Sequence, residues 1–150
     1  MKVVRAIAIV ALAFLGVSAI AGGVMLLRDP SGHPMNIPQT VLQHTPFHSF
    51  LIPGMLLLVS QGLMSLAVLA IAVFSKRGYG WWIGFQGCNL FAWITIEVML
   101  LREVVWLHYA YWALGLLLIA CGWALHRNER VAQAPAVTRL PVPSATLPHR

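Results

Sequence analysis

Residues 81–125 read WWIGFQGCNLFAWITIEVMLLREVVWLHYAYWALGLLLIACGWAL, two apolar runs separated by little more than Arg102 and Glu103. Each run has about the 20 apolar residues that a helix needs to cross the hydrocarbon core of a bilayer. Because the break between the runs is so short, the stretch predicts a tight antiparallel pair of transmembrane helices at 81–101 and 104–125.

Two further apolar runs, at 6–27 and 50–74, precede this pair. The chain of 150 residues is 59% hydrophobic and only 9% charged, whereas about 25% of the residues of a soluble domain are charged. The sequence therefore predicts an all-α fold, an integral membrane four-helix bundle in residues 1–127 with an external connector at 28–49 that forms a short helical cap. A proline-rich, disordered tail is expected at 128–150.

The start of the chain also has features of a secretory signal peptide. Lys2 and Arg5 precede an apolar stretch, and the A-I-A at 19–21 matches the small-residue pattern of a cleavage site. However, the apolar run continues beyond this point to Leu27 and is long enough to span a membrane. We therefore expect the first helix to remain in the protein.

The lysines and arginines predict the orientation of the helices. Eight of the ten lie before the first run, between the second and third, or after the fourth, whereas Arg28 and Arg102 lie on the other side. Since Lys and Arg concentrate in cytoplasmic loops, we expect both termini in the cytoplasm and the connector outside. The net charge of +6 is thus read as a topology signal, and nucleic acid is not a predicted partner.

Polar residues inside the predicted spans need partners, because lipid cannot form hydrogen bonds with them. Gln86, Asn89, Trp93 and Glu97 recur at spacings of three and four, so they share one face of the third helix. An ionisable residue within a span is by default a candidate for function. Glu97 is therefore the leading candidate in the sequence.

Other polar residues can meet this face from the neighbouring helices. Glu97 lies four residues before the end of its span and His108 four residues after the start of the next, which places both about 6 Å below the outer interface. A contact between them is expected if the two faces point together. The predicted ligand-binding residues are Glu97, His108, Asn89, Gln86, Gln61 and Tyr111. The alternative for the amides is a packing role as interhelical hydrogen bonds.

The connector contains several prolines at positions where helices can begin. Pro38 predicts a short helix at 39–44, because proline fits the first turn of a helix. Thr45 followed by Pro46 resembles an N-cap and first helical residue, which would start the second helix early. A kink is expected further along, at 53–54. The connector should then lie as a lid over a site whose floor holds Glu97 and His108.

No metal site, cofactor or catalytic residue is predicted. The external histidines invite a metal hypothesis, but neither H-E-x-x-H nor C-x-x-C spacing occurs. Cys88 and Cys121 lie within apolar runs and are expected to be small packing residues. A membrane thiol or quinone oxidoreductase is therefore only a distant alternative.

One pattern resembles a known group of proteins. It comprises D-P-S-G at 29–32, I-P at 37–38, T-P-F at 45–47 and F-L-I-P-G at 50–54. The chain is similar in this respect to a group of uncharacterised small bacterial membrane proteins with four helices. The resemblance implies the four-helix fold and the bacterial inner (plasma) membrane. Where that group often has glycine, this chain has Asn36, and Glu97 occupies a place where an amide or acid is common.

Together these observations predict a multi-pass membrane protein, not an enzyme, with a structural, accessory or small-ligand-binding role. The alternative is a small transporter or proton-coupled subunit that uses Glu97 and His108, which at this chain length would need to assemble as an oligomer. The predicted partners are the lipid bilayer and either further copies of the chain or another membrane protein.

Overall fold

The computed structural model describes residues 1–74, 77–102 and 104–133, apart from the side chains at 34, 41, 44 and 133. Over these residues the chain is helical and contains no strand. Four helices are long and apolar enough to cross a membrane. They are α1 (Lys2–Arg28), a continuous helix made of α2 (Leu51–Leu56), the π-helical η3 (Leu57–Leu63) and α3 (Met64–Val73), then α4 (Tyr79–Leu101) and α5 (Trp106–Gln133).

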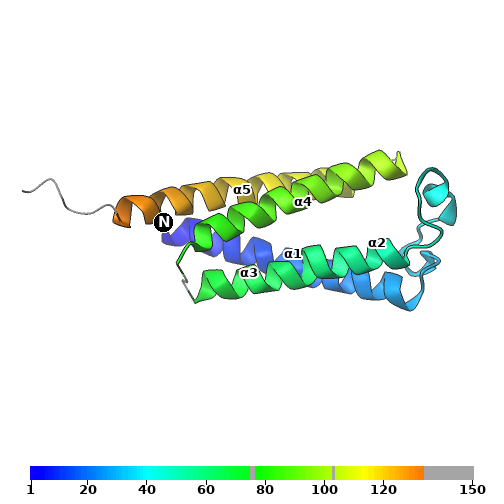
Figure 1. Ribbon diagram of the computed structural model, residues 1–150, viewed down its shortest axis with the longest axis horizontal. Helices are drawn as coiled ribbons and strands as arrows, with labels where there is room; N and C mark the ends of the chain where they lie inside the picture. The colour runs from blue at the N-terminus through cyan, green and yellow to red at the C-terminus, as the bar shows by residue number, and fades with distance from the viewer. Residues whose placement is uncertain (75–76, 103, 134–150) are drawn as a thin grey trace, which may run out of the picture.

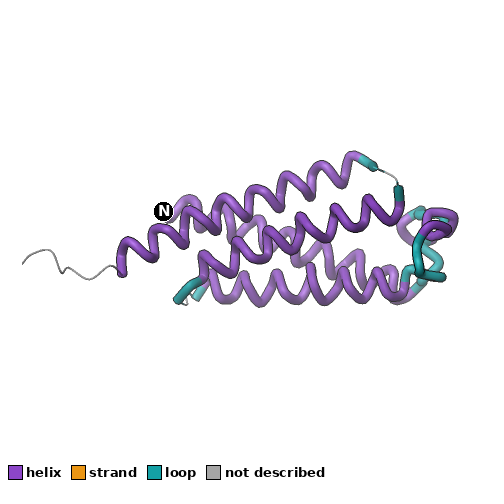
Figure 2. Tube along the Cα trace, turned by 45° about the horizontal axis from the view of Figure 1, so that its top comes forward, coloured by secondary structure: helices purple, strands orange, loops and turns teal. Residues whose placement is uncertain are grey.

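The helices form two antiparallel hairpins. α1 packs along α2, η3 and α3, and α4 packs along α5. The hairpins meet most closely at the end that holds the N-terminus, where α3 contacts α4, and α4 diverges from α2 toward the other end (Figure 1). The segment between α1 and α2, residues 29–50, closes that other end, which we call the cap end (Figure 2).

α1 ends where the sequence becomes Asp29-Pro30. Asp29 is extended, with φ −137°, because the residue before a proline avoids the helical conformation. Its carboxylate accepts the Ser31 backbone N–H at 3.1 Å. Hydrogen bonds from the Ser31 side chain and backbone lower the pKa of Asp29 below its usual range. This turn directs the chain across the end of the bundle.

The cap is a compact unit with two short 3-10 helices, η1 (His33–Met35) and η2 (Gln39–His44). The short helix predicted at 39–44 is thus present. The Phe50 N–H donates to the Pro30 carbonyl at 2.9 Å, which joins the two ends of the cap. Leu26, Leu42 and Phe50 form its own small core.

Asn36 occupies the position at which the similar membrane proteins often have glycine. Its φ of 52° is left-handed, a conformation that glycine adopts freely and asparagine tolerates better than most residues. Asparagine can therefore adopt at this position the left-handed conformation that glycine would adopt.

The second helix begins later than predicted. Thr45 accepts the Phe47 N–H at 3.2 Å, as an N-cap would, but the helix starts only at Leu51. The intervening residues stay non-helical, so that Phe47 can pack on the cap core. Pro53 falls in the first turn of α2, where no backbone N–H has a helical partner. The departure from α-helical geometry in this helix is the π-helical segment η3.

α5 extends into the segment that was predicted to be a disordered tail. It continues to Gln133, so the prediction of a disordered tail from 128 is wrong for residues 128–133. The rest of that prediction, at 134–150, lies outside the described residues. The added turns carry Glu129, which contacts the start of α4 as described below.

Glycines bring α4 and α5 into backbone contact. A Cβ atom at Gly122 would lie 2.8 Å from the Gly80 carbonyl oxygen and closer still to the Gly84 backbone. A Cβ atom at Gly87 would lie 2.7 Å from the backbone nitrogen of Ile119. Such distances leave no room for a methyl group, so these small residues set the spacing of the second hairpin.

Replacing Gly122 with alanine should therefore destabilise the protein. The methyl group would force the two backbones apart, and we expect the free energy of unfolding to fall by about 1–3 kcal/mol, measured by thermal unfolding in detergent micelles. Gly84→Ala is the matched control, because a Cβ atom there has no contact closer than 3.8 Å. Equal stability of the two variants would contradict the assigned packing.

Candidate functional site

A cavity lies at the cap end, between α4 and the helix α2–η3. It has a volume of about 180 Å³ and is partly enclosed. Its walls are almost entirely apolar side chains from α1, α2, η3, α4 and the cap. The lining residues are Leu26, Met35, Ile37, Leu42, Thr45, Phe47, Phe50, Pro53, Leu56, Leu57, Trp93, Ile96, Glu97, Leu100 and Leu101.

Glu97 is the only ionisable residue among those that line this cavity. It is half-buried, and its carboxylate forms no hydrogen bond or ion pair with any other described residue. Trp93, one turn earlier on α4, also lines the cavity, and its indole N–H is buried without a partner. A carboxyl group without a protein partner inside apolar walls is therefore the most unusual polar feature of the cap end.

The sequence did not single out the residues that cover Glu97. Leu42 and Phe47 belong to the cap and line the cavity with Glu97, but they were not predicted as site residues. Trp93 was predicted only to share a face of the third helix with Gln86, Asn89 and Glu97. A signal was present for two of them, because Leu42 and Phe47 are large apolar side chains in a largely polar connector. What could not be read was which helix they would cover, since this depends on the divergence of α4 from α2.

The three predicted amides lie elsewhere, in the middle of the bundle. The Gln86 side-chain NH₂ lies 2.9 Å from the Ser65 hydroxyl and 3.2 Å from the side-chain carbonyl oxygen of Gln61. It also lies 3.3 Å from the Ser60 backbone carbonyl oxygen. The Asn89 NH₂ donates to the same Ser60 carbonyl at 2.9 Å. These contacts connect α4 with η3 and α3, and Gln61, Ser65 and Gln86 are fully buried.

This amide cluster coincides with the π-helical segment. A π turn departs from the regular ladder of i to i−4 backbone bonds, and the Ser60 carbonyl within it accepts side-chain bonds from two α4 residues. The Gln86 NH₂ has two hydrogens for three acceptors, and its carbonyl oxygen is buried without a partner. The geometry accounts for these amides as ties between the two hairpins.

Tyr111 occupies a third location. Its hydroxyl donates to the Ser18 hydroxyl at 3.0 Å, and Ser18 in turn donates to the Leu15 carbonyl at 3.1 Å. Tyr111 therefore joins α5 to α1 and does not line the cavity that contains Glu97. The six predicted residues are thus distributed over several places and do not form one pocket.

His108 does not meet Glu97. Its Nδ1 atom accepts the Val105 backbone N–H at 3.0 Å, and the His108 backbone N–H donates to the Val105 backbone carbonyl at 3.0 Å. Since α5 begins at Trp106, Val105 is the N-cap and His108 the third helical residue. The histidine side chain thus makes one half of a capping box, the bond from the third helical residue back to the N-cap N–H, in the place that glutamate usually takes. The expected contact is absent because His108 is engaged by the start of its own helix.

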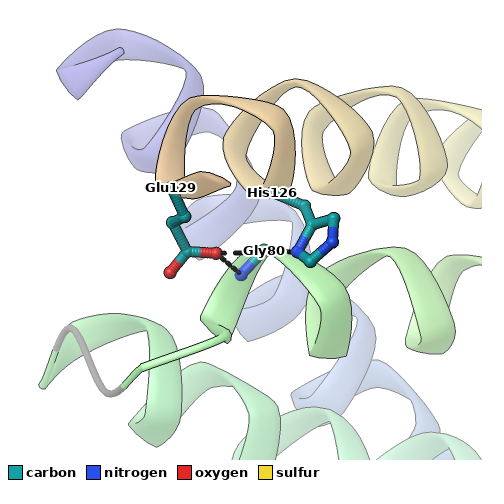
Figure 3. Close-up of polar contacts among 3 residues, drawn as sticks. All are labelled: Gly80, His126 and Glu129. Atoms are coloured by element: carbon teal, nitrogen blue, oxygen red, sulfur yellow. Dashed lines mark hydrogen bonds and ion pairs between the residues drawn. The ribbon is translucent and has the colours of Figure 1, made fainter. Parts of the chain in front are cut away.

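Two further charged side chains, which were not predicted from the sequence, contact the end of α3 and the start of α4. Arg5 donates to the Ala72 and Val73 carbonyls at 3.0 and 2.8 Å, at the C-terminal end of α3. Glu129 accepts the Gly80 N–H at 3.3 Å and lies 3.9 Å from Nδ1 of His126 (Figure 3). Each charge is favourable for the dipole of the helix end it contacts.

The cysteines are free, Cys88 exposed and Cys121 buried. In the described parts of the chain, no three His, Cys, Asp or Glu residues gather where they could hold a metal ion. Comparison with protein-family models, curated proteins and solved structures finds no match to this chain.

The capping role of His108 can be tested by substitution. His108→Ala leaves the Val105 N–H without its acceptor, and we expect a loss of about 1 kcal/mol in the free energy of unfolding, measured by thermal unfolding in micelles. His108→Gln should recover most of this loss, because glutamine at this position can accept the same N–H. If the two variants were equally stable, the capping role would be disproved.

Proposed function

We propose that this chain is a multi-pass integral membrane protein of the bacterial plasma membrane whose cap-end cavity binds a small, largely apolar molecule. Both termini lie in the cytoplasm, and the cap lies outside. The membrane assignment is supported by the outer surface of the bundle, where large apolar side chains such as Val10, Phe14 and Met99 are 68%, 60% and 73% exposed. A soluble monomer rarely exposes so much contiguous apolar surface.

The aromatic residues support the same placement. Trp81 and Trp123 are exposed near the end that holds the N-terminus, and Trp106 and Tyr109 are exposed near the cap end. Trp and Tyr prefer the two interfaces of a bilayer, where their amphipathic rings lie at the level of the headgroups. The orientation follows from the excess of Lys and Arg on the side of the termini.

The observation that carries the binding proposal is the unpaired Glu97 carboxyl group in an apolar cavity beneath the cap. Most small-molecule sites are concave and apolar, with a few polar groups that orient the ligand. The cavity fits this description, with Glu97 as the orienting group. Gln61, Gln86, Asn89 and Tyr111 then serve packing, and His108 caps α5.

The orientation can be tested by labelling single cysteines in a chain whose Cys88 and Cys121 are replaced by alanine. In intact cells, a membrane-impermeant maleimide should label His33→Cys in the cap and should not label Asn128→Cys in α5. Asn128→Cys should become reactive once the membrane is permeabilised. Labelling of Asn128→Cys in intact cells would contradict the proposed topology.

Binding in the cavity can be tested with 1-pentanol, since about 180 Å³ holds roughly six non-hydrogen atoms at about 30 Å³ each. Saturation-transfer NMR on protein in nanodiscs, with empty nanodiscs as the blank, should detect binding. Ile96→Trp at the cavity mouth should weaken it by roughly tenfold or more.

Met99→Trp provides the matched control for this experiment, because Met99 is an exposed residue of α4 outside the cavity lining. It should bind 1-pentanol like the wild type. Equal binding by all three proteins would show that the alcohol merely partitions near the protein surface, and the proposed site would be refuted.

A further inference from the structure

The cavity opens toward the outer surface of the bundle. Leu56 on α2 and Ile96 on α4 line it and are also 44% and 51% exposed. Both side chains therefore bridge the inside of the cavity and the apolar exterior. If the bundle is embedded in a bilayer, as proposed above, the exterior here is hydrocarbon. A ligand can then reach the cavity sideways, with an apolar chain in contact with these residues.

The electrostatics of the cavity determine which headgroup such a ligand would carry. No described residue among those lining the cavity is a lysine, arginine or histidine. An ionised carboxyl group in apolar surroundings is costly unless a counter-charge or hydrogen-bond donors reach it. An acidic ligand would add a second negative charge, whereas a cation would compensate the first.

The remaining walls suit a cationic group. Phe47, Phe50 and Trp93 line the same cavity as Glu97, and aromatic rings attract ammonium groups through their π faces. Glu97 lies four residues before the end of α4 at Leu101, and thus about 6 Å below the helix end. An ammonium group at this depth can contact Glu97 while its alkyl chain follows the apolar side opening.

We propose that the cavity selects primary alkylammonium ions, with the nitrogen at Glu97 and the alkyl chain between α2 and α4. This inference rests on the proposed binding function and specifies its ligand class. The same ammonium chemistry is available from a free small amine and from the headgroup of phosphatidylethanolamine.

The test compares ligands of equal length on two proteins in phosphatidylcholine nanodiscs at neutral pH. Pentylammonium should bind the wild type roughly tenfold or more tightly than Glu97→Gln, because hydrogen bonds to charged groups are stronger than neutral ones. 1-Pentanol should bind the two proteins within about twofold, which shows that the substituted cavity is intact. Pentanoate should bind the wild type more weakly than it binds Glu97→Gln.

The outcomes separate the two proposals. If 1-pentanol binds both proteins and pentylammonium shows no preference for the wild type, the ligand class is wrong while the cavity function stands. If neither probe binds the wild type, the cavity function fails and the inference fails with it.

A second arm distinguishes the two sources of the ammonium group. The pentylammonium titration is repeated with phosphatidylethanolamine added to the nanodiscs. Weaker apparent binding of pentylammonium would support the inference with the lipid headgroup as competitor. Unchanged binding would support it with a free amine as ligand.

Discussion

The side-chain amide of Gln86 is the point at which the two hairpins of this protein are tied together. It reaches the Ser65 hydroxyl, the Gln61 carbonyl and the Ser60 backbone carbonyl. On one side of this tie, toward the end that holds the N-terminus, α3 and α4 are in contact. On the other side α4 moves away from α2, and the cap-end cavity occupies the space between them. The cavity therefore lies on the cap side of the depth at which the amide hydrogen bonds join the hairpins.

Within each hairpin, the two helices are held together by close backbone packing at glycines. In the second hairpin Gly122 lies against Gly80 and Gly84, and in the first a Cβ atom at Gly23 would lie 3.0 Å from the Gly54 carbonyl. Each hairpin is thus a closely packed pair with little freedom in its own spacing. The space between the hairpins is set by larger side chains, and this is where a ligand can be accommodated without disturbing the helix pairs.

The positions of the helices were predictable because they follow from the order of apolar and charged residues along the chain. The length of an apolar run and the break at Arg102 determine where α4 and α5 meet, and no knowledge of packing is needed. The cap was partly predictable for a similar reason, since Pro38 marks the start of η2. The late start of the second helix was not, because Thr45 makes the local bond of an N-cap while the packing of Phe47 decides the path of the chain.

The candidate site was less predictable than the fold. Spacing along one helix correctly grouped Gln86 and Asn89 on one face, and both reach Ser60. The same spacing grouped Glu97 with them, although the divergence of α4 places it in a separate apolar cavity. His108 was misread because its partner lies three residues away in its own chain segment. Glu129 was missed because the ordered helix continues past the point where the apolar pattern ends.

The π-helical segment η3 has a consequence for how the cap is oriented. A π turn accommodates one residue more than the α-helical path requires, and one residue corresponds to about 100° of rotation about the helix axis. The residues of α2, nearer the cap, are therefore offset in angle about the helix axis from those of α3, while both segments stay in contact with α1. A deletion of one residue at 58–63 would remove this offset while keeping the cavity residue Leu57, and would turn α2 and the cap relative to Glu97.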